Sequence, residues 1–172
     1  NAPLAEQQRI RQGMKSILFV DDEALILNAL RRGFRHRRDD WQMTFVESAQ
    51  QALEHLETQT TDILVTDIRM PVMDGIALLK IVRQRYPQLA RIALSGYSDQ
   101  EAVLKSSTLV HQFLPKPFEL SNVEQAIEGA LDQVSKLQNP ALERLIGQIE
   151  ALPSMPNLYF ELISAVNKID CS

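Results

Sequence analysis

Residues 16–23 read SILFVDDE, so that an apolar run passes directly into three consecutive acids. Ile17 to Val20 has the composition of a strand buried on both faces, which is typical of a parallel sheet. Three carboxylates that converge on one edge of such a sheet are costly unless a cation or protons compensate them. This stretch therefore predicts both a buried parallel strand and a charged site at its carboxyl end.

From Lys15 onward, short apolar runs alternate with segments of helical periodicity. Strands are predicted at residues 16–20, 41–48, 62–67, 91–96 and 111–118, and helices at residues 24–36, 49–56, 76–86, 99–104 and 120–137. Ser48 stands where an N-cap is expected, and Pro87 ends the third helix. Five strand–helix pairs in strict alternation predict an α/β fold, a doubly wound five-stranded parallel sheet with helices on both faces.

Composition narrows the class of protein. The net charge of −4 gives no support to a nucleic-acid binder, and the basic run from Arg31 to Asp40 is interpreted as a solvated helix end. Cys171 is the single cysteine, so a disulfide framework is excluded and a reducing compartment is expected. No apolar run approaches the roughly 20 residues that span a bilayer. We expect a cytoplasmic protein with neither nucleic acid nor membrane as a direct partner.

Polar residues gather where four of the predicted strands end. Asp21 and Asp22 follow the first strand, Asp67 ends the third, Ser95 ends the fourth and Lys116 follows the fifth. Functional groups of such sheets collect at the carboxyl ends of the strands. Short acids without a nearby His or Cys suit Mg²⁺ better than zinc. With a lysine and a hydroxyl, they form a set of groups suited to phosphoryl transfer, in which one carboxylate is the nucleophile.

Four separate motifs resemble the receiver domain of bacterial two-component response regulators. They are DDE after the first strand, DIRMPVMDG around Asp67, LSGY and LPKPF, all in the order of that family, and the likeness runs from about Lys15 to Leu137. The resemblance implies the flavodoxin-like receiver fold. It also implies a protein that is not an enzyme beyond its own Mg²⁺-dependent phosphorylation.

The resemblance assigns a role to each site residue. Asp67 matches the phosphoacceptor, which takes a phosphoryl group from a sensor histidine kinase or a phosphotransfer protein. Asp22, Asp67 and the backbone carbonyl of Arg69 match the protein ligands of Mg²⁺, and Asp21 matches the acid that reaches the ion chiefly through water. Lys116 matches the lysine that pairs with the phosphate, and the peptide that follows this lysine is usually cis in the family.

The resemblance also implies a switch. Ser95 matches the hydroxyl that turns to the phosphate, and Phe113 stands at the position of the switch aromatic, which is more often tyrosine in the family. Phosphorylation is then expected to remodel the face made by the fourth helix, fifth strand and fifth helix. That face is the expected site for binding the chain's own output domain or a second copy in a homodimer.

The strand–helix alternation stops near Asn139. We interpret residues 1–13 as a leader or cloning remnant, 14–138 as the receiver domain and 139–172 as the helical start of an incomplete output domain. Two amphipathic helices are predicted at residues 142–152 and 158–169, joined by LPSMP. This C-terminal helical extension resembles the opening of an HDOD domain, a signalling module.

Other functions remain as alternatives. The chain could be the receiver of a cyclic-dinucleotide phosphodiesterase whose catalytic domain lies beyond Ser172. A haloacid-dehalogenase-like phosphatase would require a second acid two residues after its nucleophile, but the residue at that position is Arg69. A nucleotide-binding enzyme would need a glycine-rich phosphate-binding motif, and this sequence contains none. A DNA-binding output would need a basic recognition helix, whereas residues 140–172 carry only Arg144 and Lys168 as basic residues.

Overall fold

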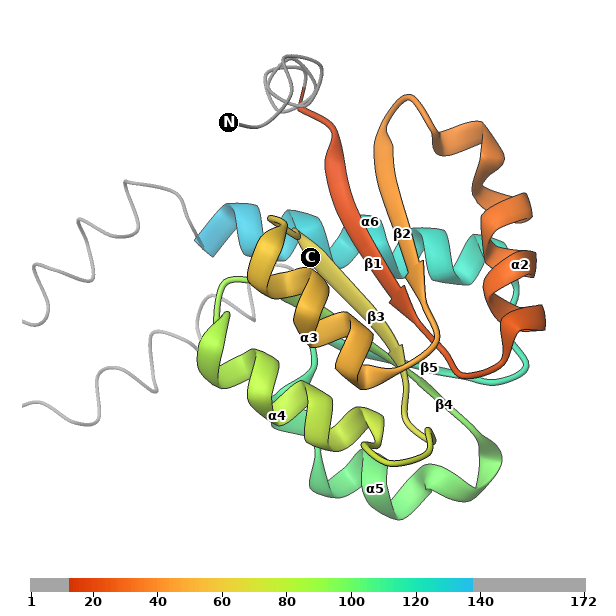
Figure 1. The fold of residues 1–172 in the computed structure, drawn as a ribbon, viewed down its shortest axis with the longest axis vertical. Coiled ribbons are helices and arrows are strands. Elements are labelled where there is room, and N and C mark those ends of the chain that lie inside the picture. Colours follow the sequence, from red (N-terminus) through yellow and green to blue (C-terminus); the bar gives the residue numbers. More distant parts are fainter. Residues whose placement is uncertain (1–12, 138–172) are drawn as a thin grey trace, which may run out of the picture. The chain divides into compact units, whose positions relative to one another are not determined.

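The computed structural model describes residues 13–137, which form one five-stranded parallel sheet flanked by helices (Figure 1). The strands are β1 (Lys15–Val20), β2 (Trp41–Val46), β3 (Ile63–Asp67), β4 (Ala90–Ser95) and β5 (Gln112–Pro115). The helices are α2 (Ala24–Gly33), α3 (Ala49–Thr58), α4 (Gly75–Arg85), α5 (Gln100–Lys105) and α6 (Leu120–Leu137). The strand order is β2-β1-β3-β4-β5, so the predicted flavodoxin-like fold is confirmed.

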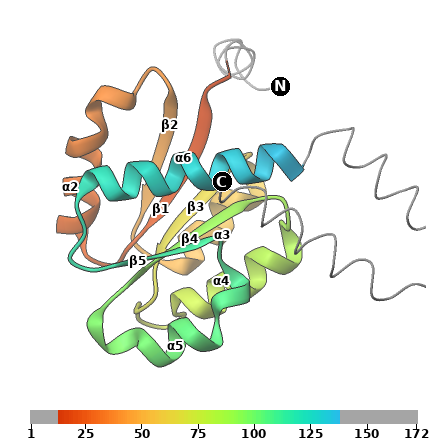
Figure 2. The ribbon, with the colours of Figure 1, turned by 180° about the vertical axis from the view of Figure 1, so that it is seen from behind.

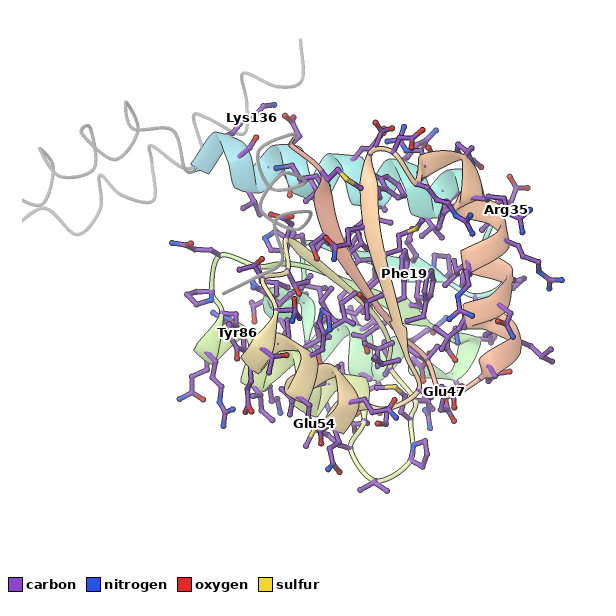
Figure 3. All side chains as sticks on the ribbon, turned by 45° about the horizontal axis from the view of Figure 1, so that its top comes forward. Phe19, Arg35, Glu47, Glu54, Tyr86 and Lys136 are labelled. Atoms are coloured by element: carbon purple, nitrogen blue, oxygen red, sulfur yellow. The ribbon has the colours of Figure 1, made fainter. Side chains whose placement is uncertain are left out.

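The two faces of the sheet bury two separate apolar cores. Helices α2 and α6 cover one face, and α3, α4 and α5 cover the other (Figures 1 and 2). Successive residues of β1 point to opposite faces: Ile17 and Phe19 join the first core, whereas Leu18 and Val20 join the second. Figure 3 places Phe19 inside these layers, with Arg35 directed away from them. This burial on both faces explains why β1 reads as an uninterrupted apolar run.

Polar side chains fix where two of the helices begin. Ser48 accepts a hydrogen bond from the Gln51 N–H (3.2 Å), as its predicted N-cap role requires. Asp74 does the same for the Ala77 N–H (2.7 Å) at the start of α4. The helix predicted over residues 24–36 is shorter in the structure, where α2 ends at Gly33 and residues 34–37 form a 3₁₀ turn. Trp41 is buried at the start of β2.

A buried arginine that pairs with no carboxylate within residues 13–137 holds the beginning of β4. Arg91 donates hydrogen bonds to three carbonyls, those of Leu109 (2.7 Å), Leu89 (2.7 Å) and Pro87 (3.3 Å). Its backbone N–H donates to Nδ1 of His111 (3.0 Å), so this ring nitrogen must carry no proton. Burial, and then the charge of Arg91, hold the pKa of His111 below its usual value. The neutral ring is therefore part of the native hydrogen-bond pattern.

We expect the stability of the protein to fall as the pH drops from about 7 through the usual histidine pKa near 6.5, because the unfolded chain then binds protons that native His111 refuses. His55, whose pKa burial also lowers, acts in the same direction. In His111→Asn, the amide oxygen can accept the hydrogen bond from the Arg91 N–H without titrating, so the stability of this variant should depend less on pH. Urea unfolding at several pH values checks this. An unchanged slope in the variant would contradict it.

Among the helices within residues 13–137, none is both long enough and apolar enough to cross a membrane. The helices predicted at residues 142–152 and 158–169 lie outside the residues that the structure describes.

Candidate phosphorylation site

Strand register brings the polar residues together at the carboxyl edge of the sheet. Val20 of β1 pairs with Thr66 of β3, so the next residues along each strand, Asp21 and Asp67, lie at the same level on neighbouring strands. Asp67 pairs in turn with Leu94 of β4, one residue before Ser95. The strand order therefore puts the two acids side by side, with the end of β4 next to them.

The acidic cluster consists of Asp21, Asp22 and Asp67. Each can offer one carboxylate oxygen such that the three atoms lie within 4.8 Å of one another. Asp21 and Asp67 are buried, whereas Asp22 is exposed. Asp21 also accepts a hydrogen bond from the Glu23 N–H (2.9 Å), which fixes the orientation of its carboxylate. Three converging oxygen donors, two of them shielded from water, fit a hard divalent cation such as Mg²⁺.

Lys116 reaches this cluster from the end of β5. Its Nζ lies 2.9 Å from Asp21 Oδ2 and 3.0 Å from Asp67 Oδ1, and so bridges the two buried carboxylates. Burial, assisted by the charge of Asp21, raises the pKa of Asp67 although Lys116 opposes the rise. Burial would lower the pKa of Lys116, but hydrogen bonds and charge from both acids outweigh it and raise that pKa. The ammonium group is therefore held charged between the acids. The Lys116–Pro117 peptide is cis.

Ser95 ends β4, and Phe113 lies in the neighbouring strand β5, where it pairs with Ala93. The buried Ser95 hydroxyl donates to the carbonyl of Leu114 (3.4 Å), across to the neighbouring strand. The Ser95 carbonyl accepts from the Lys116 N–H (2.7 Å), which ties the ends of β4 and β5 together. Phe113 is half-buried and packs against the core on the α3–α5 face. The Ser95 hydroxyl and the Phe113 ring thus lie on neighbouring strands, and Lys116 follows the second of these strands.

Arg69, whose backbone carbonyl is the predicted third protein ligand of the metal, lies in the loop between β3 and α4. Its side chain leaves the acidic cluster and pairs with Asp99, Nε to Oδ1, at 2.5 Å. The sequence predicts Asp99 only as the first residue of a helix, yet it is 1% exposed and binds both Arg69 and the Gly96 N–H. An acid three residues after a glycine, just before a helical segment, could have indicated the bond back to Gly96.

Sequence reasoning also missed Gly75. A Cβ at this position would lie 1.9 Å from the backbone oxygen of Asp67, so only glycine lets the start of α4 approach the end of β3 this closely. The Gly75 N–H also donates to the Ile68 carbonyl at 2.8 Å. This close approach fixes the backbone that carries Asp67.

Comparison with known proteins places the chain in a family. Residues 17–128 match the family model described as "Response regulator receiver domain". The "DNA-binding transcriptional regulator NtrC" of Escherichia coli (strain K12) is 32% identical over 158 residues, which cover 89% of this chain and 33% of that protein. The chain therefore spans about a third of the length of this relative.

Two solved structures share the fold. The "response regulator receiver domain Protein from clostridium thermocellum" superposes with a TM-score of 0.66 at 25% identity, covering 72% of this chain and 99% of that one. The "signal receiver domain OF HD domain-containing protein FROM Pseudomonas fluorescens Pf-5" gives a TM-score of 0.66 at 28% identity, covering 72% and 98%. Together with the matching family model and the edge-of-sheet site, these likenesses show that the chain belongs to the response regulator receiver domain family.

Proposed function

We propose that Asp67 accepts a phosphoryl group from a phosphohistidine of a sensor kinase or phosphotransfer protein, and that this modification switches an output domain. Receiver domains are typically phosphoacceptors of two-component signalling and not enzymes, and they bind Mg²⁺ at an acidic pocket. One observation carries the proposal for this chain: Lys116 Nζ bridges Asp21 and Asp67 at the carboxyl edge of the sheet. A buried carboxylate beside a cation and two further acids is arranged for attack on phosphorus.

In the proposed step, an Asp67 carboxylate oxygen forms the new bond to phosphorus. The phosphorus–nitrogen bond of the donor breaks, and its electron pair stays on the imidazole nitrogen. Lys116, already 3.0 Å from Asp67 Oδ1, is placed to pair with an oxygen of the incoming group. Mg²⁺ held by Asp21, Asp22, Asp67 and the Arg69 carbonyl would supply positive charge to the same oxygens. Burial of Asp67 and Asp21 limits the access of water to the acyl phosphate.

The switch that we propose begins at Ser95. Its hydroxyl exchanges the 3.4 Å bond to the Leu114 carbonyl for a phosphoryl oxygen, and Phe113 turns into the space that is left. The half-buried position of Phe113 against the α3–α5 core supports this, because a ring that is only partly buried can still rotate inward. The face formed by α5, β5 and α6 would then change shape and bind the output domain or a second copy of the chain.

The output remains a proposal from sequence, because residues 138–172 lie outside the described part of the chain. We propose that residues 14–138 are the receiver and that residues 139–172 begin an HDOD-like signalling domain, preceded by a leader or cloning remnant at 1–13. We further propose that the protein works in the cytoplasm without binding DNA directly. The alternative is a phosphodiesterase output. It is supported by the solved relative whose receiver domain belongs to an "HD domain-containing protein".

Wild type incubated with acetyl phosphate and Mg²⁺ is expected to gain the mass of one phosphoryl group, and Asp67→Asn is expected to gain none. Asp39→Asn, which changes an exposed acid away from the cluster, serves as the matched control and should behave as wild type. Intact-protein mass spectrometry measures all three. A gain by Asp67→Asn would assign the nucleophile to another residue, and no gain by wild type would overturn the proposed function.

A further inference from the structure

The side chain of Arg69 connects the loop between β3 and α4 to the segment after β4. Arg69 stands two residues beyond Asp67, yet its Nε donates to Asp99 Oδ1 (2.5 Å) and its Nη2 to the Ser98 carbonyl (3.3 Å). The Arg69 side chain is 66% exposed, whereas that of Asp99 is 1% exposed. A solvated, movable cation therefore neutralises a buried anion, and only the arginine can leave without unfolding its surroundings.

Asp99 closes the turn between Ser95 and α5. Its second oxygen accepts from the Gly96 N–H (2.6 Å), and its own N–H donates to the Gly96 carbonyl (3.1 Å). Without Arg69, a carboxylate with almost no contact with water would keep a single amide donor. Breaking a buried charge pair by removing one partner is strongly destabilising, because the remaining charge is not solvated. The turn is therefore stable only while the guanidinium stays.

Few other contacts hold this segment in place, chiefly that of the partly buried Val103 with the core. None of the six residues of α5 is buried, Tyr97 is 92% exposed, and Leu104 is 78% exposed. A cavity of about 470 Å³ lies between the segment and the residues that end β5, Pro115 and Lys116. Segments with few buried apolar contacts open at low cost in free energy. The position of Tyr97–Lys105 consequently depends on the turn that Asp99 closes.

A phosphoryl group on Asp67 would compete with Asp99 for Arg69. The pKa of Arg69 is raised by its bond to Asp99 and by the charge of Asp99, and also by the charge of Asp67. Arg69 thus already experiences the field of the phosphoacceptor. The phosphoryl group on Asp67 carries a charge of roughly −1.5 to −2 in place of the single charge of the carboxylate, and its strong acceptor oxygens can be bound by a guanidinium in a bidentate manner. The attraction toward Asp67 then grows while that toward Asp99 is unchanged.

We propose that Arg69 is a second sensor of the phosphoryl group: on phosphorylation it leaves Asp99 for the phosphoryl oxygens, and the unpaired Asp99 releases Tyr97–Lys105. The inference rests on the proposed function, since it requires phosphorylation of Asp67. It differs from the Ser95–Phe113 switch in acting through an ion pair. Arg69 here is a positioning residue, which holds the segment through Asp99 in one state and frees it in the other.

Two substitutions separate the steps, with hydrogen–deuterium exchange of the amides of residues 97–105 as the readout. Arg69→Gln leaves Asp99 charged and alone, so exchange should be about tenfold faster before phosphorylation and should not rise further after it, equivalent to about 1.4 kcal/mol. Asp99→Asn keeps an acceptor for Gly96 but carries no charge, so phosphorylation should no longer change the exchange. Arg69→Lys restores a cation and should return the basal exchange toward that of wild type.

Wild type is expected to show fast exchange in this segment only when phosphorylated with acetyl phosphate and Mg²⁺, while the amides of β1 and β3 stay protected. Intact mass measured on the same samples reports phosphoryl occupancy. Full occupancy without faster exchange overturns the sensor role of Arg69, as does wild-type exchange in unphosphorylated Arg69→Gln. Absence of the phosphoryl mass from wild type overturns the proposed function instead, and the unphosphorylated variants still test the tie between Arg69 and Asp99.

Discussion

Gly75→Ala is expected to lower the free energy of unfolding by about 3 kcal/mol, the upper end for overpacking. The added methyl group would lie 1.9 Å from the Asp67 backbone oxygen, and backbone on both sides leaves no flexible side chain to give way. Relief requires α4 to move away from the end of β3, which also displaces Asp67. We therefore expect phosphorylation by acetyl phosphate to slow by about tenfold or more, because reacting groups tolerate little misplacement. Urea unfolding and intact mass against time measure the two effects.

Gly129→Ala is the matched control, because the same methyl group meets nothing within 4 Å at this exposed position of α6. Alanine is favoured over glycine in a helix interior, so this variant should be more stable by roughly 0.5–1 kcal/mol. The same substitution thus has opposite signs at the two glycines. If Gly75→Ala were as stable as wild type, the close approach of α4 to Asp67 would be wrong.

The sequence was sufficient for the architecture because, apart from the partly buried edge strands β2 and β5, the strands of this sheet are buried on both faces over most of their length. Such strands read as apolar runs, and parallel strands force helical crossovers between them, so the periodicity alternates along the chain. The same logic located Asp21, Asp67, Ser95 and Lys116, since every parallel strand delivers its last residue to one edge. Their contact distances then follow from strand order and register, which the alternation alone does not specify.

What sequence could not supply depends on contacts between distant segments. The need for a glycine at position 33 is one example, since a Cβ there would meet the Leu120 side chain of α6 at 2.2 Å. Arg91 is another: it lies inside an apolar strand, and besides two nearby carbonyls it binds that of Leu109, which is 18 residues further along the chain. Asp99 reads locally as a helix cap, and its pairing with Arg69 arises only when β3 and β4 lie side by side.

Lys116→Met is expected to weaken the fold and to strengthen magnesium binding at the same time. In the native protein Lys116 compensates two buried acids, Asp21 and Asp67. Methionine keeps much of the length but removes the charge, so two like charges would remain in a poorly solvated place. We expect a loss of about 2 kcal/mol of stability without Mg²⁺, less than for a fully buried pair because the lysine is partly exposed.

The stability lost in Lys116→Met should depend on pH in a defined direction. Loss of Lys116 removes what opposes the raised pKa of Asp67, so the pKa of this acid rises further above its unfolded value. The native variant then binds a proton that the unfolded chain releases, and its stability falls as the pH increases through that interval. The deficit should therefore be small near pH 4 and full at pH 8. Lys105→Met, at an exposed pair with Glu101, is the matched control and should change stability by less than about 0.5 kcal/mol.

Magnesium binding discriminates between two roles of Lys116. If the ammonium group competes with the cation for Asp21 and Asp67, its removal should tighten Mg²⁺ binding by about tenfold in calorimetric titrations, since each 1.4 kcal/mol of lost repulsion is a factor of ten. Phosphorylation should nevertheless slow by about 10²–10³, the usual cost of removing one preorganised charge from a transition state. Tighter metal binding with slower phosphorylation would assign the lysine to the phosphoryl group. Weaker metal binding would instead mean that Lys116 holds the carboxylates in the geometry that the metal requires.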